Sequence, residues 1–151
     1  MREQYLFEMI EKTRKSLLQE VAKLSEEKAK RIPEGFNNNI IWNVGHILLA
    51  TKVLVFDFAG EPFSLPEDCE KFFAKGTKPS DWQEEPPSLS VLNTLLEEQL
   101  NTMLSIFSGK LASSVRENFK GAETVGELLL VNLLHENTHA NTIYAMKKIL
   151  K

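Results

Sequence analysis

The 151-residue sequence predicts an all-α fold: a four-helix bundle with a long crossover between the second and third helices. Three observations support this prediction. Four separate stretches place apolar residues at helical spacing, and no stretch alternates between apolar and polar residues as a half-buried strand would. A proline-rich segment, residues 60–88, separates the second stretch from the third. We therefore treat residues 1–151 as one bundle domain, long enough to bury a core without disulfides.

The first predicted helix spans about residues 2–30 and ends at "RIPEGF", where Pro33 and Gly35 stop a helix. The second runs from "NNN" to Gly60, with Asn39 as its N-cap. Its inward stripe consists of Trp42, His46, Leu49, Val53 and Phe56. A histidine therefore occupies a position where a core residue is expected.

The last two predicted helices follow the crossover. We expect this segment either to hold a short helix around "EDCEKFF" or to run the length of the bundle as a connection. The third helix spans about residues 88–108. The fourth begins at "TVGE", a capping box formed by Thr124 and Glu127, and continues to the C-terminus. Its predicted inward stripe is Val125, Leu128, Asn132, His135, His139, Ile143 (or Thr142), Met146, and Ile149 or Leu150. Polar residues in the middle of this stripe suggest that the bundle holds a site.

Composition excludes several classes of protein. The net charge is −3 with acidic and basic residues interspersed, so nucleic acid is not an expected partner. The single cysteine, Cys69, fits a reducing compartment. The first residues do not resemble a signal peptide, and the apolar run "HILLATKVLVFDFAG" falls short of the roughly 20 residues of a membrane span. We expect a cytoplasmic protein with no membrane partner.

The segment "HENTH" contains His135 and His139, two of the three histidines in the chain. Residues four apart share a helix face, so their imidazoles can bind one metal ion. A single inward histidine is usually a hydrogen-bonded core residue. Three neutral imidazoles buried together, however, leave several nitrogens without partners, and a metal ion satisfies them at once. We therefore predict that His46, His135 and His139 bind a divalent metal.

The same segment matches HExxH, the signature of zinc proteases in which the glutamate activates a metal-bound water. Its context argues against a protease. The extended motif requires a third histidine where Ala145 stands, and no predicted strand could align a peptide substrate.

Two further residues of the last helix are candidates for catalysis. Glu136 could act as a general base or orient a ligand. Because it lies about 100° around the helix from His135, an exposed or inter-helix carboxylate is the alternative. Asn132 could contact substrate or hydrogen-bond a histidine, or it could be a core amide. For Asn43, one turn before His46, we expect capping or a bond between helices.

Three segments, "FNNNIIWNVGHILLATKVLV", "FAKGTKP" and "ETVGELLLVNLLHENTHANTIYAMKKIL", resemble the DinB/YfiT-like family of metal-binding four-helix proteins. The resemblance covers nearly the whole chain. It implies that His46, His135 and His139 bind a divalent metal, commonly zinc or nickel, with water in the open positions. It also implies a homodimer and, for some members, transfer of low-molecular-weight thiols such as bacillithiol. The family often continues its last motif as His-x-Gly-Gln-Ile, whereas Ala140, Asn141 and Thr142 follow His139 here.

Three neutral protein ligands leave a coordination position open, a condition that lowers the pKa of a bound water or thiol. We therefore expect a metal-dependent enzyme acting on small molecules, a thiol S-transferase or a hydrolase. Zinc is favoured over nickel or manganese, and a low-molecular-weight thiol is the expected co-substrate. The alternative is a non-catalytic, metal-stabilised binding or stress-response protein. In that case a fourth protein ligand would close the site, and Asp57 is a weak candidate.

Overall fold

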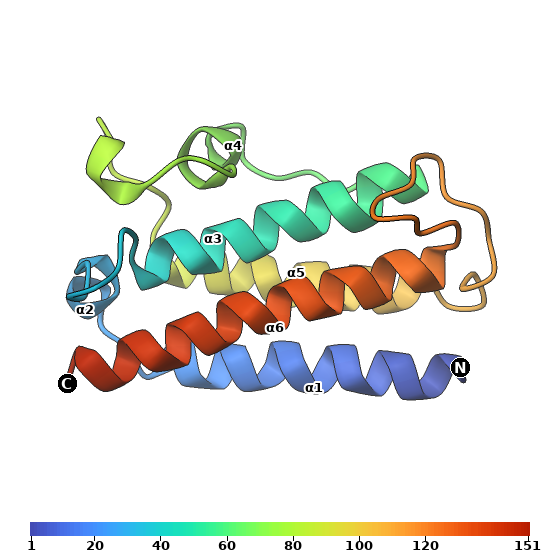
Figure 1. The fold of residues 1–151 in the computed structure, drawn as a ribbon, viewed down its shortest axis with the longest axis horizontal. Helices are drawn as coiled ribbons and strands as arrows, with labels where there is room; N and C mark the ends of the chain where they lie inside the picture. Colours follow the sequence, from blue (N-terminus) through green and yellow to red (C-terminus); the bar gives the residue numbers. More distant parts are fainter.

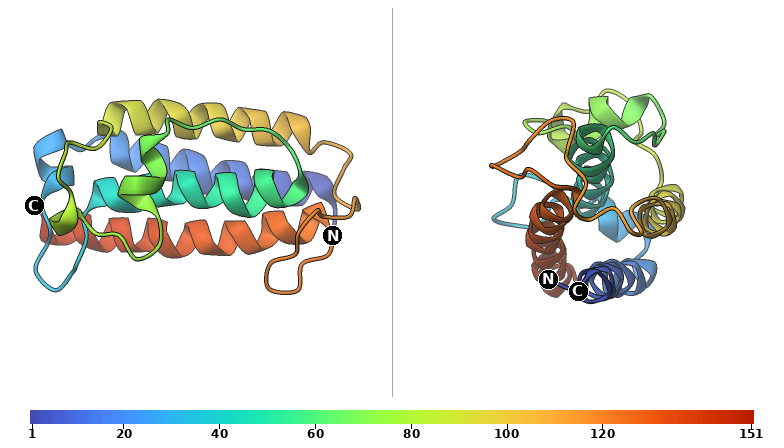
Figure 2. Two further views of the ribbon diagram at one scale, coloured as in Figure 1. Left: turned by 90° about the horizontal axis from the view of Figure 1, so that it is seen from above. Right: turned by 90° about the vertical axis from the view of Figure 1, so that its right-hand side faces the viewer.

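Four long helices form the bundle, in a computed structural model that describes residues 1–151 (Figure 1). They are α1 (Glu3–Ala22), α3 (Ile40–Thr51), α5 (Leu89–Ile106) and α6 (Val125–Ile149). A π-helical segment, η1 (Lys52–Asp57), extends α3. The end-on view of Figure 2 shows the long helices around a common core, with the crossover outside α3. The predicted all-α bundle with a crossover between its second and third long helices is confirmed.

The long helices α3, α5 and α6 begin at capping side chains, and those of α3 and α6 were identified in the sequence. The side chain of Asn39 accepts a hydrogen bond from the backbone of Trp42 at 2.8 Å, which begins α3. Ser88 caps α5 in the same way. Thr124 and Glu127 form both bonds of the capping box that begins α6. These side chains satisfy backbone N–H groups that have no partner inside the helix.

The first predicted helix is two helices. α1 ends at Ala22, and a short helix, α2 (Glu26–Lys30), follows. Ser25 has an extended backbone and its hydroxyl accepts from the backbone of Lys28 at 3.2 Å, so it caps a new helix. The apolar pattern continues across this break, since Ala29 is buried in the same core, and apolar periodicity alone therefore did not reveal it.

The crossover packs a short helix directly against α3. This helix, α4 (Asp68–Phe73), corresponds to the first of the two alternatives considered for the crossover, a short helix around "EDCEKFF". A 3₁₀ turn, η2 (Pro79–Asp81), follows it. The close approach depends on Gly45. A Cβ atom at this position would lie 2.4 Å from the ring of Phe73, so only glycine lets α4 lie this close to α3.

The core consists of two apolar clusters, one toward each end of the bundle. The larger joins the end of α1, α3, α4, the start of α5 and the end of α6. The smaller joins the start of α1, η1, the end of α5 and the start of α6. The apolar segment Ile40–Asp57 is long and apolar enough to cross a membrane, with a mean hydropathy of 1.4, yet 67% of it is buried inside the protein. Its apolar residues therefore serve the core of the bundle.

A buried polar network lies between the two clusters. Arg14, which is fully buried, forms an ion pair with Glu136 and donates to Thr51 at 3.3 Å. It also donates to the carbonyl of Leu96 at 2.9 Å and to the side chain of Gln99 at 3.2 Å. The network connects all four long helices. Because each polar group finds a partner, the charges are tolerated in the interior.

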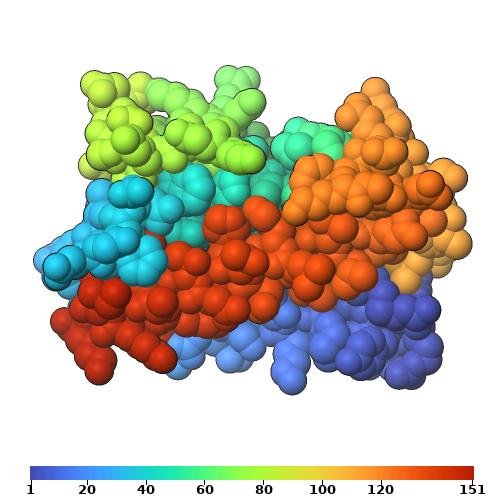
Figure 3. All heavy atoms as spheres, in the orientation of Figure 1, coloured from blue at the N-terminus to red at the C-terminus, as the bar shows by residue number.

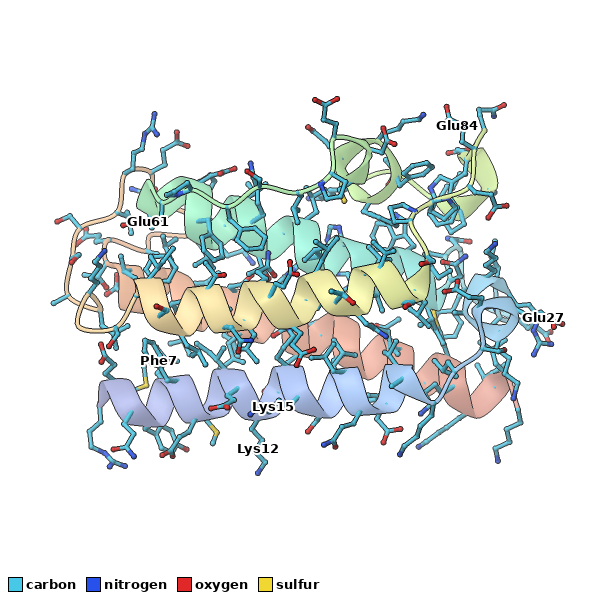
Figure 4. All side chains as sticks on the ribbon, turned by 180° about the vertical axis from the view of Figure 1, so that it is seen from behind. Phe7, Lys12, Lys15, Glu27, Glu61 and Glu84 are labelled. Atoms are coloured by element: carbon cyan, nitrogen blue, oxygen red, sulfur yellow. The ribbon has the colours of Figure 1, made fainter.

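We predict that Arg14→Met lowers the free energy of unfolding by about 3–5 kcal/mol, because it leaves the Glu136 carboxylate buried without its partner. Urea denaturation measures the loss. The double variant Arg14→Met, Glu136→Leu should recover much of it. The control is Lys15→Met, on the outer face of α1 (Figure 4), where Lys15 forms an exposed pair with Glu11. This change should cost no more than about 0.5 kcal/mol. A similar loss in both single variants would contradict the prediction.

Candidate metal centre

The three histidines meet between α3 and α6. Each offers a ring nitrogen, and these three atoms all lie within 4.8 Å of one another. The ring centroids are 4.6 Å apart for His46 and His139, 4.6 Å for His135 and His139, and 5.2 Å for His46 and His135. The convergence expected from helical spacing is therefore present, and the cluster could hold a divalent metal ion.

His46 is oriented by its surroundings on two sides. Its Nδ1 lies 2.8 Å from the backbone carbonyl oxygen of Phe73, at the end of α4. A carbonyl only accepts, so Nδ1 carries the proton and Nε2 keeps its lone pair. The ring also stacks on Trp42, with centroids 4.6 Å apart and planes 9° apart. The imidazole is thus fixed in a tautomer whose Nε2 lone pair is available to a metal ion.

His139 is oriented by Asn43 of α3. The side-chain nitrogen of Asn43 donates to the carbonyl of Asn39 and to the side chain of Asn38, each at 2.9 Å. Its oxygen is therefore left to accept from His139 Nδ1, also at 2.9 Å. His139 keeps its lone pair on Nε2 as well. The inter-helix bond considered for Asn43 is present. That this bond orients a histidine was not predicted. The only indication in the sequence was the position of Asn43, one turn before His46.

His135 provides a test of whether a metal fits. Its Nδ1 is buried and has no hydrogen-bond partner in the protein. An unsatisfied buried nitrogen costs free energy, and such groups are uncommon in native structures. His46 and His139 each have a free Nε2 lone pair next to His135. A metal cation bound by the three imidazoles is therefore compatible with the donor atoms of the cluster. Neutral imidazole nitrogens favour zinc, copper, iron or nickel over calcium or magnesium.

Burial keeps these imidazoles neutral. It lowers the pKa of His135 and of His139 to about 4, and it lowers that of His46 as well. The positive charge that neighbouring histidines would carry adds to the effect on His135 and His139. Lys120 also lowers the pKa of His135. At neutral pH the lone pairs are therefore free to bind a metal.

In the middle of α6, the residues that face the core lie one position after the two histidines that were predicted to face it. The buried residues there are Asn132, Glu136 and Ala140, whereas His135 and His139 are half-buried at the edge of the helix interface. The reason is the ion pair between Glu136 and Arg14, which draws the carboxylate into the core. Periodicity alone favoured the histidines, because an isolated glutamate is rarely buried.

Two residues considered for catalysis therefore lie on the core side of α6. Glu136 pairs with Arg14, and Asn132 exchanges hydrogen bonds with Thr51, at 3.2 Å and 3.4 Å. Neither lines the cavity onto which the histidines open. Their catalytic roles stay predictions. Asp57, considered as a fourth ligand, is not part of the histidine cluster and binds Lys52 at 2.8 Å.

A cavity of about 1030 Å³ opens beside the histidines. Its walls come from α3 and η1, from the crossover and from Phe119 and Lys120 in the loop before α6. Figure 3 shows the crossover and this loop rising on either side of the exposed part of α3. Of the stripe of α3 and η1 that was predicted to face the core, Leu49 and Val53 line this cavity together with Trp42 and His46. Only Phe56 at its end is fully buried in the core without lining the cavity. The histidines are thus accessible to a small molecule.

Comparison with known proteins agrees with this architecture. A sequence model of the DinB superfamily matches residues 9–143. The chain belongs to the DinB superfamily. None of the curated proteins matches it. Among solved structures, the DinB-superfamily chain is similar to a crystal structure described as the conserved protein of locus from Enterococcus faecalis, with a TM-score of 0.69 and 13% sequence identity. The match covers 99% of this chain and 98% of that one, and it shows the shared fold.

We predict that Gly45→Ala in this DinB-superfamily protein weakens metal binding about 10- to 100-fold, the usual effect of losing a bond that orients a ligand. The added Cβ would displace Phe73, and with it the carbonyl that holds His46. Titration of the metal-free protein measures the change. The variant Gly45→Ala, Phe73→Ala relieves the clash and should bind metal better than Gly45→Ala alone. Unchanged affinity in Gly45→Ala would exclude this role for the contact.

We further predict that the metal-free protein loses stability as the pH falls from 6.5 to about 4. In this range the unfolded histidines take up protons that His135 and His139 resist when folded, so protonation favours unfolding. Urea denaturation at a series of pH values measures the slope. His135→Gln removes one of these groups and should reduce the slope. An equal slope in both proteins would show that carboxylates alone cause the acid effect.

Proposed function

We propose that this protein binds one divalent metal ion, zinc in preference to nickel or manganese, through His46, His135 and His139. We further propose that it is an enzyme acting on small molecules, a thiol S-transferase first and a hydrolase second. The observation that carries the proposal is the set of three neutral donors beside a large cavity, with no carboxylate or thiol in the cluster. Catalytic sites commonly use three protein ligands, whereas structural zinc sites are closed by four.

The residues of the chain have separate tasks in this proposal. His46 and His139 present Nε2 because the Phe73 carbonyl and Asn43 hold their Nδ1 protons. When bound, the metal would lower the pKa of a coordinated thiol or water. The apolar residues of the cavity, among them Leu49, would bind the rest of the small molecule and exclude water.

Glu136 and Asn132 act in this proposal by positioning. Both are buried in the network that fixes α6 against α1 and α3, so they set the direction in which His135 and His139 point. The alternative for the site as a whole is a structural metal in a non-catalytic protein. One observation favours it: the histidines join α3 to α6 and, through Phe73, to the crossover. The homodimer, the thiol and the cytoplasmic location stay predictions.

We predict that His46→Ala, His135→Ala and His139→Ala each abolish binding of one zinc ion per chain. Elemental analysis of protein purified without a chelating tag, followed by equilibrium dialysis against zinc, measures this. Asn43→Ala is the matched control. It keeps all three donors and removes the bond that orients His139, together with the amide's bonds to Asn38 and Asn39. It should weaken binding by about 10- to 100-fold without abolishing it. Tight stoichiometric zinc in a histidine variant would remove that residue from the site.

The cobalt-substituted protein distinguishes the two candidate functions. A short thiol that changes the visible spectrum of bound cobalt supports an open site and a transferase. An unchanged spectrum, together with unfolding on chelation, would favour the structural role and contradict the proposed enzyme.

A further inference from the structure

We propose that Lys120 makes the cavity selective for small molecules that carry an anionic group, such as a carboxylate or phosphate, on an apolar body. This inference names the substrate class of the site and rests on the proposed function. It depends on the placement of Lys120, on the charges around the cavity and on the apolar character of its walls.

The backbone holds Lys120 at the cavity in an unusual conformation. The backbone N–H of Ala122 donates to the carbonyl of Phe119 at 3.0 Å, which closes a four-residue turn. Its central residues, Lys120 and Gly121, have φ of 53° and 80°. Positive φ at both positions is typical of a type I′ turn, where glycine, asparagine or aspartate is preferred at the place of Lys120. A lysine kept in a strained position beside a site indicates a role for its side chain.

The rest of the loop fixes this turn relative to the site. The backbone N–H groups of Arg116 and Glu117 both donate to the carbonyl of Phe58, just after η1, at 2.7 and 3.1 Å. The ring of Phe119 packs near that of Phe58, with centroids 6.2 Å apart. Lys120 Nζ lies 5.5 Å from the centroid of the Phe119 ring. The cation is therefore carried by a loop that is anchored to the same helical element as His46.

The charges of the cavity leave Lys120 available to a ligand. Lys52 is already paired with Asp57 at 2.8 Å, whereas Lys75 and Lys120 form no ion pair. The charge of Lys120 lowers the pKa of His135, as a cation near that histidine does. The carboxylates of Glu67 and Glu70 also line the cavity, at the start of α4. A divalent cation held by the histidines would add positive charge beside Lys120.

Apolar side chains cover much of the remaining wall. They come from α3, η1, the crossover and the loop, and include Leu49, Val53, Leu54, Phe63, Leu65 and Phe119. A purely ionic ligand would leave this apolar surface exposed to water, whereas a ligand with an apolar body would bury it. The fitting chemistry is therefore an apolar small molecule with an anionic group that Lys120 can reach.

The test uses phenylacetate and the neutral phenylacetamide as probes of nearly equal shape. Their dissociation constants are measured by NMR titration of the full chain, with zinc and without it. We expect phenylacetate to bind more tightly than phenylacetamide in both forms. Lys120→Gln should weaken phenylacetate binding about two- to fivefold, as for one exposed charge pair, and leave phenylacetamide unchanged. Lys75→Gln is the matched control, an unpaired lysine of the same cavity, and should change neither.

A second variant tests whether a loss of affinity could come from misfolding. Lys120→Gly takes away the same charge and relieves the positive φ, so it should be at least as stable as the wild type in thermal unfolding. Loss of phenylacetate affinity in both Lys120 variants supports the inference. Equal binding of the two probes by the wild type, or equal losses in the Lys75 and Lys120 variants, would overturn it.

The outcome is separable from that of the proposed function. If the wild type takes up no zinc, the proposed function fails, and the metal-free titrations still decide whether Lys120 selects anions. If zinc binds but the probes do not differ, the selectivity fails and the metal site stands.

Discussion

The ion pair between Arg14 and Glu136 fixes the rotation of α6, and the arrangement of the site depends on it. The guanidinium is held at the same time by groups on α3 and α5, so it cannot follow Glu136 if α6 turns. Turning the helix by one residue would separate two buried charges, which is costly in a low-dielectric interior. With Glu136 directed inward, His135 and His139 must face the seam between α6 and α3. There they meet His46 and open onto the cavity.

This rotation explains why an HExxH pattern has a different meaning here from its meaning in a zinc protease. In such proteases the glutamate works on the metal-bound water, beside the two histidines. In this bundle the same residue belongs to the core, and its partner Arg14 is 122 positions away in the sequence. The spacing of two histidines on one helix face is a local property, whereas the direction of the residue between them depends on the tertiary fold.

The parts of the fold that were predictable depend on local signals. Asn39 and Thr124 satisfy the first backbone N–H groups of α3 and α6, so the starts of these helices could be located from the sequence. Ser88 does the same for α5 and was not singled out. The break before α2 could not be located, because Leu24 and Ala29 maintain the apolar pattern across it. At the site, the three histidines were found because their spacing placed them on facing stripes. The Phe73 carbonyl was not, since backbone acceptors have no signature in the sequence, and Lys120 lies in a turn that periodicity does not describe.

The hydrogen bond from His46 to the Phe73 carbonyl makes the crossover part of the surroundings of the metal centre. Any ligand that requires the present tautomer of His46 also favours the position of α4 that supplies the acceptor. Occupancy of the site and local opening of the crossover are therefore linked equilibria, and each must shift the other by the same free energy. Local opening of the connecting segment therefore depends on whether a ligand is bound at the histidines. The amide protons of α4 should exchange with solvent more slowly when the histidines bind a ligand.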